Sequence, residues 1–185
     1  MSEPGAPFRL GINYWPAETG MAWWSRFDAA VVERDFRRIA EAGMDCVRIF
    51  LLWEEFQPAP REIDGGRAGL LVEVCEIAVR AGLQVIPTLF TGHMSAANWL
   101  PSWALGMALD PVPRFPAVSR GRPTGRMLRN WYSDPAVADA QAWFCGEIAA
   151  RLRGHAAWLR GDGFEHGQNA AFRGNLIASR RGPGA

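Results

Sequence analysis

Apolar runs and segments of helical period alternate along much of this chain. Three apolar runs, near residues 10–16, 47–52 and 83–89, each end in polar and aromatic residues. A segment in which apolar residues recur at helical spacing follows each run, although the third begins only after a long interval. Because strands that alternate with helices are typical of a parallel sheet with helical crossovers, the pattern predicts an α/β fold of successive βα units.

Capping residues indicate where the predicted helices begin and end. Asp28 can cap a first helix that ends at Gly43, and a second helix ends at Gly82. Asp134 and Pro135 mark the start of a third helix, whose apolar positions form one stripe. Three crossovers are therefore expected, and the second strand, apolar on both faces, should be covered on both sides.

The other segments show no such periodicity. Residues 91–133 are rich in Pro, Gly and Trp and are expected to form a long loop that no regular pattern organises. Residues 155–159 begin like a fourth strand, whereas residues 160–185 are polar and Gly-rich, which predicts a flexible tail. We therefore expect one domain over residues 1–159 and a non-matching tail over residues 160–185.

The length of the chain limits how many βα units it can contain. A (β/α)8 barrel takes about 250 residues and rarely fewer than about 200, and this chain has 185. Hydrophobic residues make up 49% of the chain, which is enough for a sizeable core. The predicted fold is an α/β, incomplete (β/α)8 TIM barrel with about the first three to four βα units.

Charge and composition argue against several kinds of partner. With 20 Lys and Arg against 19 Asp and Glu, the formal net charge is +1, so no net field draws the chain to nucleic acid or to an anionic membrane. The amino terminus lacks the pattern of a secretory signal, and no apolar run approaches the length of a membrane span. We expect a cytoplasmic protein.

The cysteines and histidines do not predict a metal site. Cys46, Cys75 and Cys145 fall within predicted strands or helices, which is typical of packed, reduced thiols. The three histidines form no closely spaced ligand cluster with them. We expect neither a metal nor a cofactor.

Four segments together carry a family likeness. They are Gly11-Ile12-Asn13-Tyr14-Trp15-Pro16, Ala22-Trp23-Trp24, Val47-Arg48-Ile49-Phe50-Leu51-Leu52-Trp53 and Thr88-Leu89-Phe90-Thr91-Gly92-His93-Met94-Ser95. Taken jointly, they resemble the cellulase superfamily of glycoside hydrolases (clan A), close to family 5 and its β-mannanase-like relatives. The resemblance runs from about Phe8 to about Leu159 and corresponds to the amino-terminal half of that family's barrel.

The resemblance implies a hydrolase chemistry that this chain carries only in part. Family members hydrolyse O-glycosidic bonds of β-linked glucan or mannan-type sugars with two glutamates, an acid/base in an Asn-Glu pair after the fourth strand and a nucleophile after the seventh. This chain reads Gly163-Phe164-Glu165 where the pair is expected, so Glu165 is the candidate remnant of the acid/base. Alternatively, the coding sequence left the family's reading frame near Trp158. Nothing in this chain corresponds to the later four strands of the family's barrel. We therefore expect a truncated, inactive fragment. Whether the chain is an enzyme stays open at this point.

Two polar residues at strand ends are candidate substrate-binding groups. Arg48 lies in an otherwise apolar strand, where a guanidinium must find partners. The resemblance implies that Arg48 supports the catalytic glutamates, and a purely structural ion pair is the alternative. His93 matches the family's strand-end histidine that lines a sugar subsite, whereas a lone histidine would otherwise be read as a surface loop residue.

Tryptophans are frequent, with nine in the chain. Trp15, Trp53 and Trp99 are candidate substrate-binding residues, because broad rings at strand ends or in the following loops can stack on sugar rings. Trp23, Trp24 and Trp103 occupy similar positions. Core packing is the alternative for any one of them.

Asn13 and Glu54 complete the candidate substrate-binding residues. The amide of Asn13 and the carboxylate of Glu54 could each bind a sugar hydroxyl, and loop capping explains both equally well. Glu54 and Glu55 do not form a catalytic pair in this interpretation, because adjacent residues on a strand point to opposite faces.

Two other functions compete with the glycosidase interpretation. One is a carbohydrate-binding or assembly half-barrel without catalysis, in which exposed strand edges favour self-association. The other is an unrelated parallel α/β enzyme. Convergence of His93 and Arg48 on one pocket would separate the family likeness from that last alternative.

Overall fold

A three-stranded parallel sheet forms the centre of the fold. The computed structural model describes residues 8–94, 97–108, 116–130 and 132–157. The sheet has the order β1-β2-β3, with β1 at Gly11–Asn13, β2 at Cys46–Leu52 and β3 at Gln84–Thr91. Both strand pairs are parallel. The predicted α/β class with a parallel sheet is therefore confirmed.

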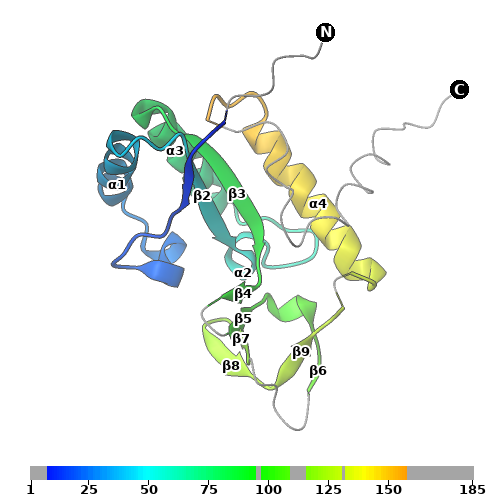
Figure 1. The fold of residues 1–185 in the computed structure, drawn as a ribbon. Coiled ribbons are helices and arrows are strands. Elements are labelled where there is room, and N and C mark those ends of the chain that lie inside the picture. Colours follow the sequence, from blue (N-terminus) through cyan, green and yellow to red (C-terminus); the bar gives the residue numbers. More distant parts are fainter. Residues whose placement is uncertain (1–7, 95–96, 109–115, 131, 158–185) are drawn as a thin grey trace, which may run out of the picture.

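Three long helices connect and flank these strands. They are α1 (Ala29–Glu41), α3 (Gly65–Ala81) and α4 (Pro135–Leu152). Figure 1 shows α1 and α3 side by side next to β1 and β2, and α4 beyond β3. No helix among the described residues is long and apolar enough to cross a membrane.

The helix ends follow local capping rules. The side chain of Asp28 accepts from the backbone N–H groups of Ala30 and Val31 at the start of α1, and Asp134 does the same for α4. Gly82 ends α3 in the left-handed conformation, with φ 74°. The predicted starts of the first and third helices and the predicted end of the second are confirmed.

One core joins the sheet to its helices. Val47, Ile49 and Leu51 of β2 are 0% exposed, and they share a hydrophobic cluster with Val32 and Phe36 of α1. These three β2 side chains point to one face of the sheet because strand side chains alternate. The helices thus bury one complete face of β2. On its other face Cys46, Phe50 and Leu52 are buried, whereas Arg48 is exposed.

The chain returns to the sheet after α4. The backbone N–H of Val85 donates to the carbonyl of Ala157 over 2.8 Å, next to the start of β3. Residues 156 and 157 form a turn, and residues 158–185, with the proposed domain boundary and tail, lie outside the described part, so the fourth strand stays a prediction. The extent of the barrel stays a prediction.

The segment after β3 is more ordered than its sequence predicts. Residues 91–133 contain a four-stranded sheet of order β4-β5-β7-β8 and a two-stranded sheet, β6-β9. The prediction of an unorganised loop was therefore wrong for the described residues, because strands of two to four residues are too short to show periodicity. The elements are β4 (His93–Met94), β5 (Ala97–Trp99), η3 (Ser102–Ala104), β6 (Leu105–Ala108), β7 (Ala117–Ser119), β8 (Arg122–Thr124) and β9 (Arg126–Leu128).

Three short helical turns complete the fold. Two 3-10 turns, η1 (Gly20–Ala22) and η2 (Trp24–Arg26), lie between β1 and α1, and α2 (Trp53–Phe56) follows β2 directly. Glu54 and Glu55 therefore lie on a helical turn. The strand geometry predicted for them was wrong, because β2 ends at Leu52 and the helical turn α2 begins at Trp53.

The edge of the described sheet remains exposed. β1 is an outer strand of the three-stranded sheet, and Leu10 and Ile12 are 49% and 45% exposed. An unpaired edge with apolar side chains favours association with another strand. Self-association through this edge stays a prediction.

Gly11 provides a test of how closely β1 and β2 pack. A Cβ atom at this position would lie 2.5 Å from Cys46 Sγ and 3.2 Å from the Cys46 carbonyl oxygen. Gly11→Ala should therefore lower the free energy of unfolding by about 1–3 kcal/mol through overpacking. Urea denaturation measures the change.

Gly69→Ala is the matched control for this prediction. A Cβ at Gly69, inside α3, meets nothing within 4 Å, so alanine should raise the free energy of unfolding by about 0.5–1 kcal/mol. Adding Cys46→Ala to Gly11→Ala should recover part of the loss, because it removes Sγ. Equal stability of Gly11→Ala and Gly69→Ala would contradict the predicted overpacking.

Candidate functional site

The candidate site lies on the face of the sheet opposite to the side chains of Val47, Ile49 and Leu51. Asn13 of β1, Arg48 of β2 and Ile86 of β3 are register partners, so their side chains share one face. Asn13 and Arg48 are exposed and Ile86 is partly buried. This face therefore presents polar groups from adjacent strands.

Arg48 is held in place by a hydroxyl and an aromatic ring. Its Nε donates to Thr88 Oγ1 over 2.7 Å, and its guanidinium carbon lies 5.0 Å from the centre of the Phe50 ring. Within the described residues, Arg48 forms no ion pair, and its terminal nitrogens have no partner. The ion-pair alternative is thus unsupported there, and the guanidinium retains donors for a ligand.

Trp15 extends the same surface. Its ring stacks on Phe50 with 5.0 Å between the ring centres and an angle of 2° between the planes. Trp15 is partly exposed. Three predicted residues, Asn13, Trp15 and Arg48, thus come together on a patch supported by Phe50 and Thr88, which we call the Arg48 patch.

The sequence analysis missed Phe50 and Thr88 as parts of this site. Phe50 lies two residues after Arg48 on the same strand, and Thr88 is the register partner of Phe50. Side chains two apart on a strand share a face, so the signal for Phe50 was present in the sequence. The signal for Thr88 depended on the strand register, which the sequence did not give.

Glu54 holds a neighbouring hairpin. Its Oε2 accepts from the backbone N–H of Arg120 over 2.6 Å. Arg120 and Gly121 form the turn between β7 and β8 with φ values of 52° and 69°. The structure therefore favours the capping alternative for Glu54, whose carboxylate fixes a turn with positive φ angles.

Glu55 is engaged in a second structural contact. Its Oε2 lies 3.2 Å from Nε of Arg67, at the beginning of α3. Burial raises the pKa of Glu55, and the positive charge of Arg67 opposes that rise. Both carboxylates that follow β2 thus support the fold.

Trp53 lies inside the core. The side chain is 0% exposed, its Nε1 donates to Gln57 Oε1 over 2.6 Å, and its ring meets Phe90 and Trp103 edge to face. Trp23 and Trp24 are buried as well. For Trp53 the structure favours core packing over an exposed sugar platform, because α2 begins at this residue and the side chain turns inward.

The other candidates are only partly described. Trp99 of β5 is half-buried, and its Nε1 donates to the carbonyl of Met94 over 3.0 Å. The backbone of His93 pairs with Asn98, but the His93 side chain and all of Glu165 lie outside the described residues. Convergence of His93 with Arg48 stays a prediction. The described residues contain no group of three or more side chains able to hold a metal ion.

Comparison with known proteins identifies the fold. No family model matches the sequence, and no curated protein matches it. Solved structures do match. An exo-beta-1,4-mannosidase from an Opitutaceae bacterium is 27% identical with a TM-score of 0.66, and the match covers 83% of this chain. A GH5_18 protein from Streptomyces cattleya in complex with GlcNAc is 30% identical with a TM-score of 0.66 over 82% of this chain.

The chain resembles glycoside hydrolases of family 5. A GH5_18 protein from Bifidobacterium longum subsp. infantis adds a third match, with 27% identity and a TM-score of 0.66. The chain spans 23%, 32% and 31% of the lengths of these three structures. The predicted family likeness is confirmed over most of this chain, and it extends over less than one third of each of these three structures.

The contact between Glu54 and the hairpin predicts a dependence of stability on pH. Burial raises the pKa of Glu54 above its ordinary value of 4.5, although the hydrogen bond from Arg120 opposes the rise. The folded protein thus holds this proton more tightly than the unfolded chain does. The contribution of Glu54 to stability is therefore full below its unfolded pKa and declines as pH rises through the raised pKa.

Glu54→Gln removes this titration and keeps an oxygen that can accept from Arg120. We expect wild type to lose stability relative to Glu54→Gln between about pH 4 and about pH 7. Urea denaturation at both pH values measures the free energy of unfolding of each protein. Glu55, whose pKa is also raised, is present in both proteins, so its contribution cancels in the comparison. If the difference in the free energy of unfolding between the two proteins stays constant, or if wild type becomes relatively more stable as pH rises, the Glu54 pKa is not raised.

Proposed function

We propose that this chain is a member of glycoside hydrolase family 5 and that its Arg48 patch binds a saccharide. The observation that carries the proposal is the state of the Arg48 guanidinium. Thr88 and Phe50 position it, and its terminal nitrogens have no partner within the described residues. Such a group, fixed and exposed, is ready to donate to a ligand oxygen without first losing side-chain entropy.

The neighbouring side chains suit a sugar. Trp15 presents a broad ring that can cover an apolar sugar face, and Asn13 presents an amide that can donate and accept. The Streptomyces cattleya protein is described in complex with GlcNAc, and a variant of it in complex with Manb1-4GlcNAc. A β-linked mannoside or a GlcNAc-containing saccharide is the ligand class that these likenesses support for this chain.

Hydrolysis requires two free carboxyl groups at a set distance, and the two glutamates that follow β2 do not provide them. Glycoside hydrolysis by two carboxyl groups needs them about 5–5.5 Å apart for retention and about 6.5–9.5 Å apart for inversion. In the described part of the chain, Glu54 is engaged by Arg120 and Glu55 by Arg67. We therefore propose that the chain by itself binds saccharide and does not hydrolyse it, with Glu165 remaining the candidate acid/base.

An assay with p-nitrophenyl β-D-mannopyranoside tests the absence of hydrolysis. Because Glu54 and Glu55, the carboxylates that follow β2 in the described part of the chain, are both engaged, the rate should equal that of buffer alone. Loss of a nucleophile or an acid removes several kcal/mol of barrier lowering. Glu165→Gln should leave this background unchanged. Turnover by wild type that Glu165→Gln abolishes would contradict inactivity and would make Glu165 catalytic.

Variants of the Arg48 patch test saccharide binding. Arg48→Ala removes a charged donor and should weaken the binding of mannobiose by about tenfold, and Trp15→Ala should weaken it by about three- to tenfold. Isothermal titration calorimetry measures both affinities. Arg38→Ala is the matched control, because Arg38 is an exposed arginine on α1. Equal affinities for wild type, Arg48→Ala and Arg38→Ala would exclude the patch as the binding site.

A further inference from the structure

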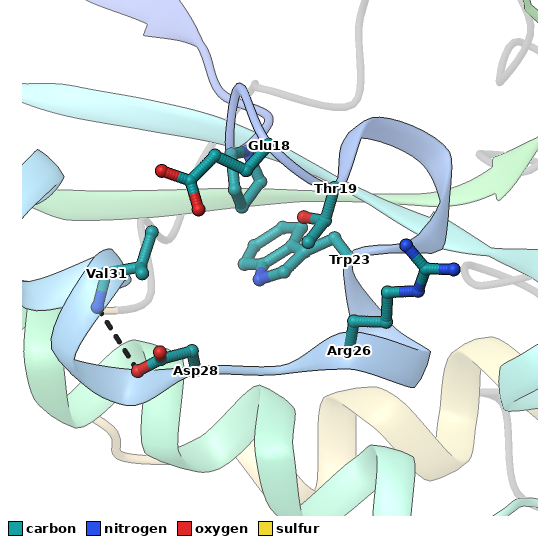
Figure 2. A pocket seen from close by; sticks show the side chains of 7 residues that line it. Glu18, Thr19, Trp23, Arg26, Asp28 and Val31 are labelled. Carbon is teal, nitrogen blue, oxygen red and sulfur yellow. Dashed lines mark hydrogen bonds between the residues drawn. The ribbon is translucent and has the colours of Figure 1, made fainter.

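A small pocket outside the Arg48 patch has polar groups for which the fold provides no partner. It has a volume of about 130 Å³ and lies between the loop after β1 and the beginning of α1. Asn13, Trp15 and Arg48 do not line it. Figure 2 shows the side chains around it. The lining residues are Pro16, Glu18, Thr19, Trp23, Arg26, Asp28 and Val31.

The indole of Trp23 is the central group of this pocket. The side chain is 1% exposed, and its Nε1 is buried without a hydrogen-bond partner among the described residues. By contrast, the adjacent Trp24 donates its Nε1 to the carbonyl of Phe50 over 2.7 Å. A buried N–H without an acceptor costs free energy, so this donor favours any ligand that brings an oxygen to it.

The Trp23 ring has little freedom to find another partner. It stacks on Trp24 with 4.2 Å between the ring centres, and it meets Tyr14 edge to face at 5.3 Å. In Figure 2 the indole nitrogen lies on the edge of the ring that is turned toward Asp28. The packing therefore fixes the N–H in an orientation that the protein itself leaves unused.

Thr19 supplies a second polar atom of the same kind. Its Oγ1 is also buried without a partner in the described part of the chain, and it lines the same pocket. A hydroxyl can donate one hydrogen bond and accept others. Two residues that line one small pocket thus each carry a buried side-chain polar atom without a partner among the described residues.

The charged groups around the pocket indicate the chemical class of the ligand. Glu18 and Asp28 present carboxylates, which disfavour an anion, and Arg26 presents a guanidinium, which disfavours a cation. Asp28 Oδ1 already accepts from Ala30 and Val31, over 2.9 Å and 3.4 Å. A neutral hydroxyl group satisfies both sides, because it accepts from an N–H and donates to a carboxylate.

We propose that this pocket binds a neutral polyhydroxylated ligand, a small polyol or a single sugar residue, at a site separate from the Arg48 patch. A ligand hydroxyl accepts from Trp23 Nε1 and donates to a carboxylate of Glu18 or Asp28. Thr19 and Arg26 bind further ligand oxygens. The small volume limits the ligand to about one ring or one short polyol.

Titration of the full chain with D-mannose and with glycerol, followed by 15N–1H NMR of the indole groups, tests the proposal. Sequential assignment identifies the Trp23 signal and avoids replacing a core residue. We expect the Trp23 indole signal to move saturably with one or both probes. The signal of Trp24, whose N–H already has an acceptor, should move much less.

Two variants at the rim of the pocket sharpen this test. Glu18→Gln and Thr19→Val should each raise the dissociation constant obtained from the Trp23 signal, by up to about tenfold. The increase should be larger for Glu18→Gln, because that substitution removes a charged group. Glu41→Gln is the matched control, because Glu41 is exposed at the end of α1 and does not line the pocket. A Trp23 signal that ignores both probes would overturn the proposal. So would a response that is equal in wild type, Glu18→Gln and Thr19→Val.

Discussion

The pairing of β2 with strands on both of its edges is the constraint on which the structure depends. One face of β2 carries Val47, Ile49 and Leu51, each 0% exposed, and the other carries the exposed Arg48. Because side chains alternate, a shift of one residue in register would turn the guanidinium toward the helices and the aliphatic residues toward the open face. The burial of one face thus fixes the register, and the register brings Asn13 and Thr88 to Arg48.

The same constraint separates Arg48, which lies inside β2, from two acidic residues at the carboxyl end of that strand. Glu54 and Glu55 come directly after β2, and both are used by the fold, through Arg120 and Arg67. Arg48 has only a hydroxyl and a ring as described partners. The acidic groups near this end therefore shape the surface, and the guanidinium retains donors that a ligand can use.

The likeness to family 5 covers a limited part of the length of the matched structures. The matched structures share the parallel sheet and its helices with this chain, and the chain spans at most 32% of the three compared in detail. The binding of a saccharide needs only one surface of a sheet, whereas hydrolysis needs two carboxyl groups at a set distance. The described residues contain the Arg48 patch, whereas Glu54 and Glu55 are engaged by the fold, and this is why the proposed function stops at binding.

The sequence by itself determined the features that depend on near neighbours. The caps Asp28 and Asp134, the stop at Gly82 and the apolar pattern of β2 act within a few residues, so periodicity and capping rules predicted the parallel α/β fold. Arg48 became a candidate because it is a charged residue in an apolar strand and because of the family resemblance. Only the tertiary structure decided the ordering of the segment after β3, the burial of Trp53 and the capture of Glu54 by Arg120, 66 residues away. These features arise from contacts between segments that are distant in the chain. Local sequence patterns do not specify which distant residues come into contact.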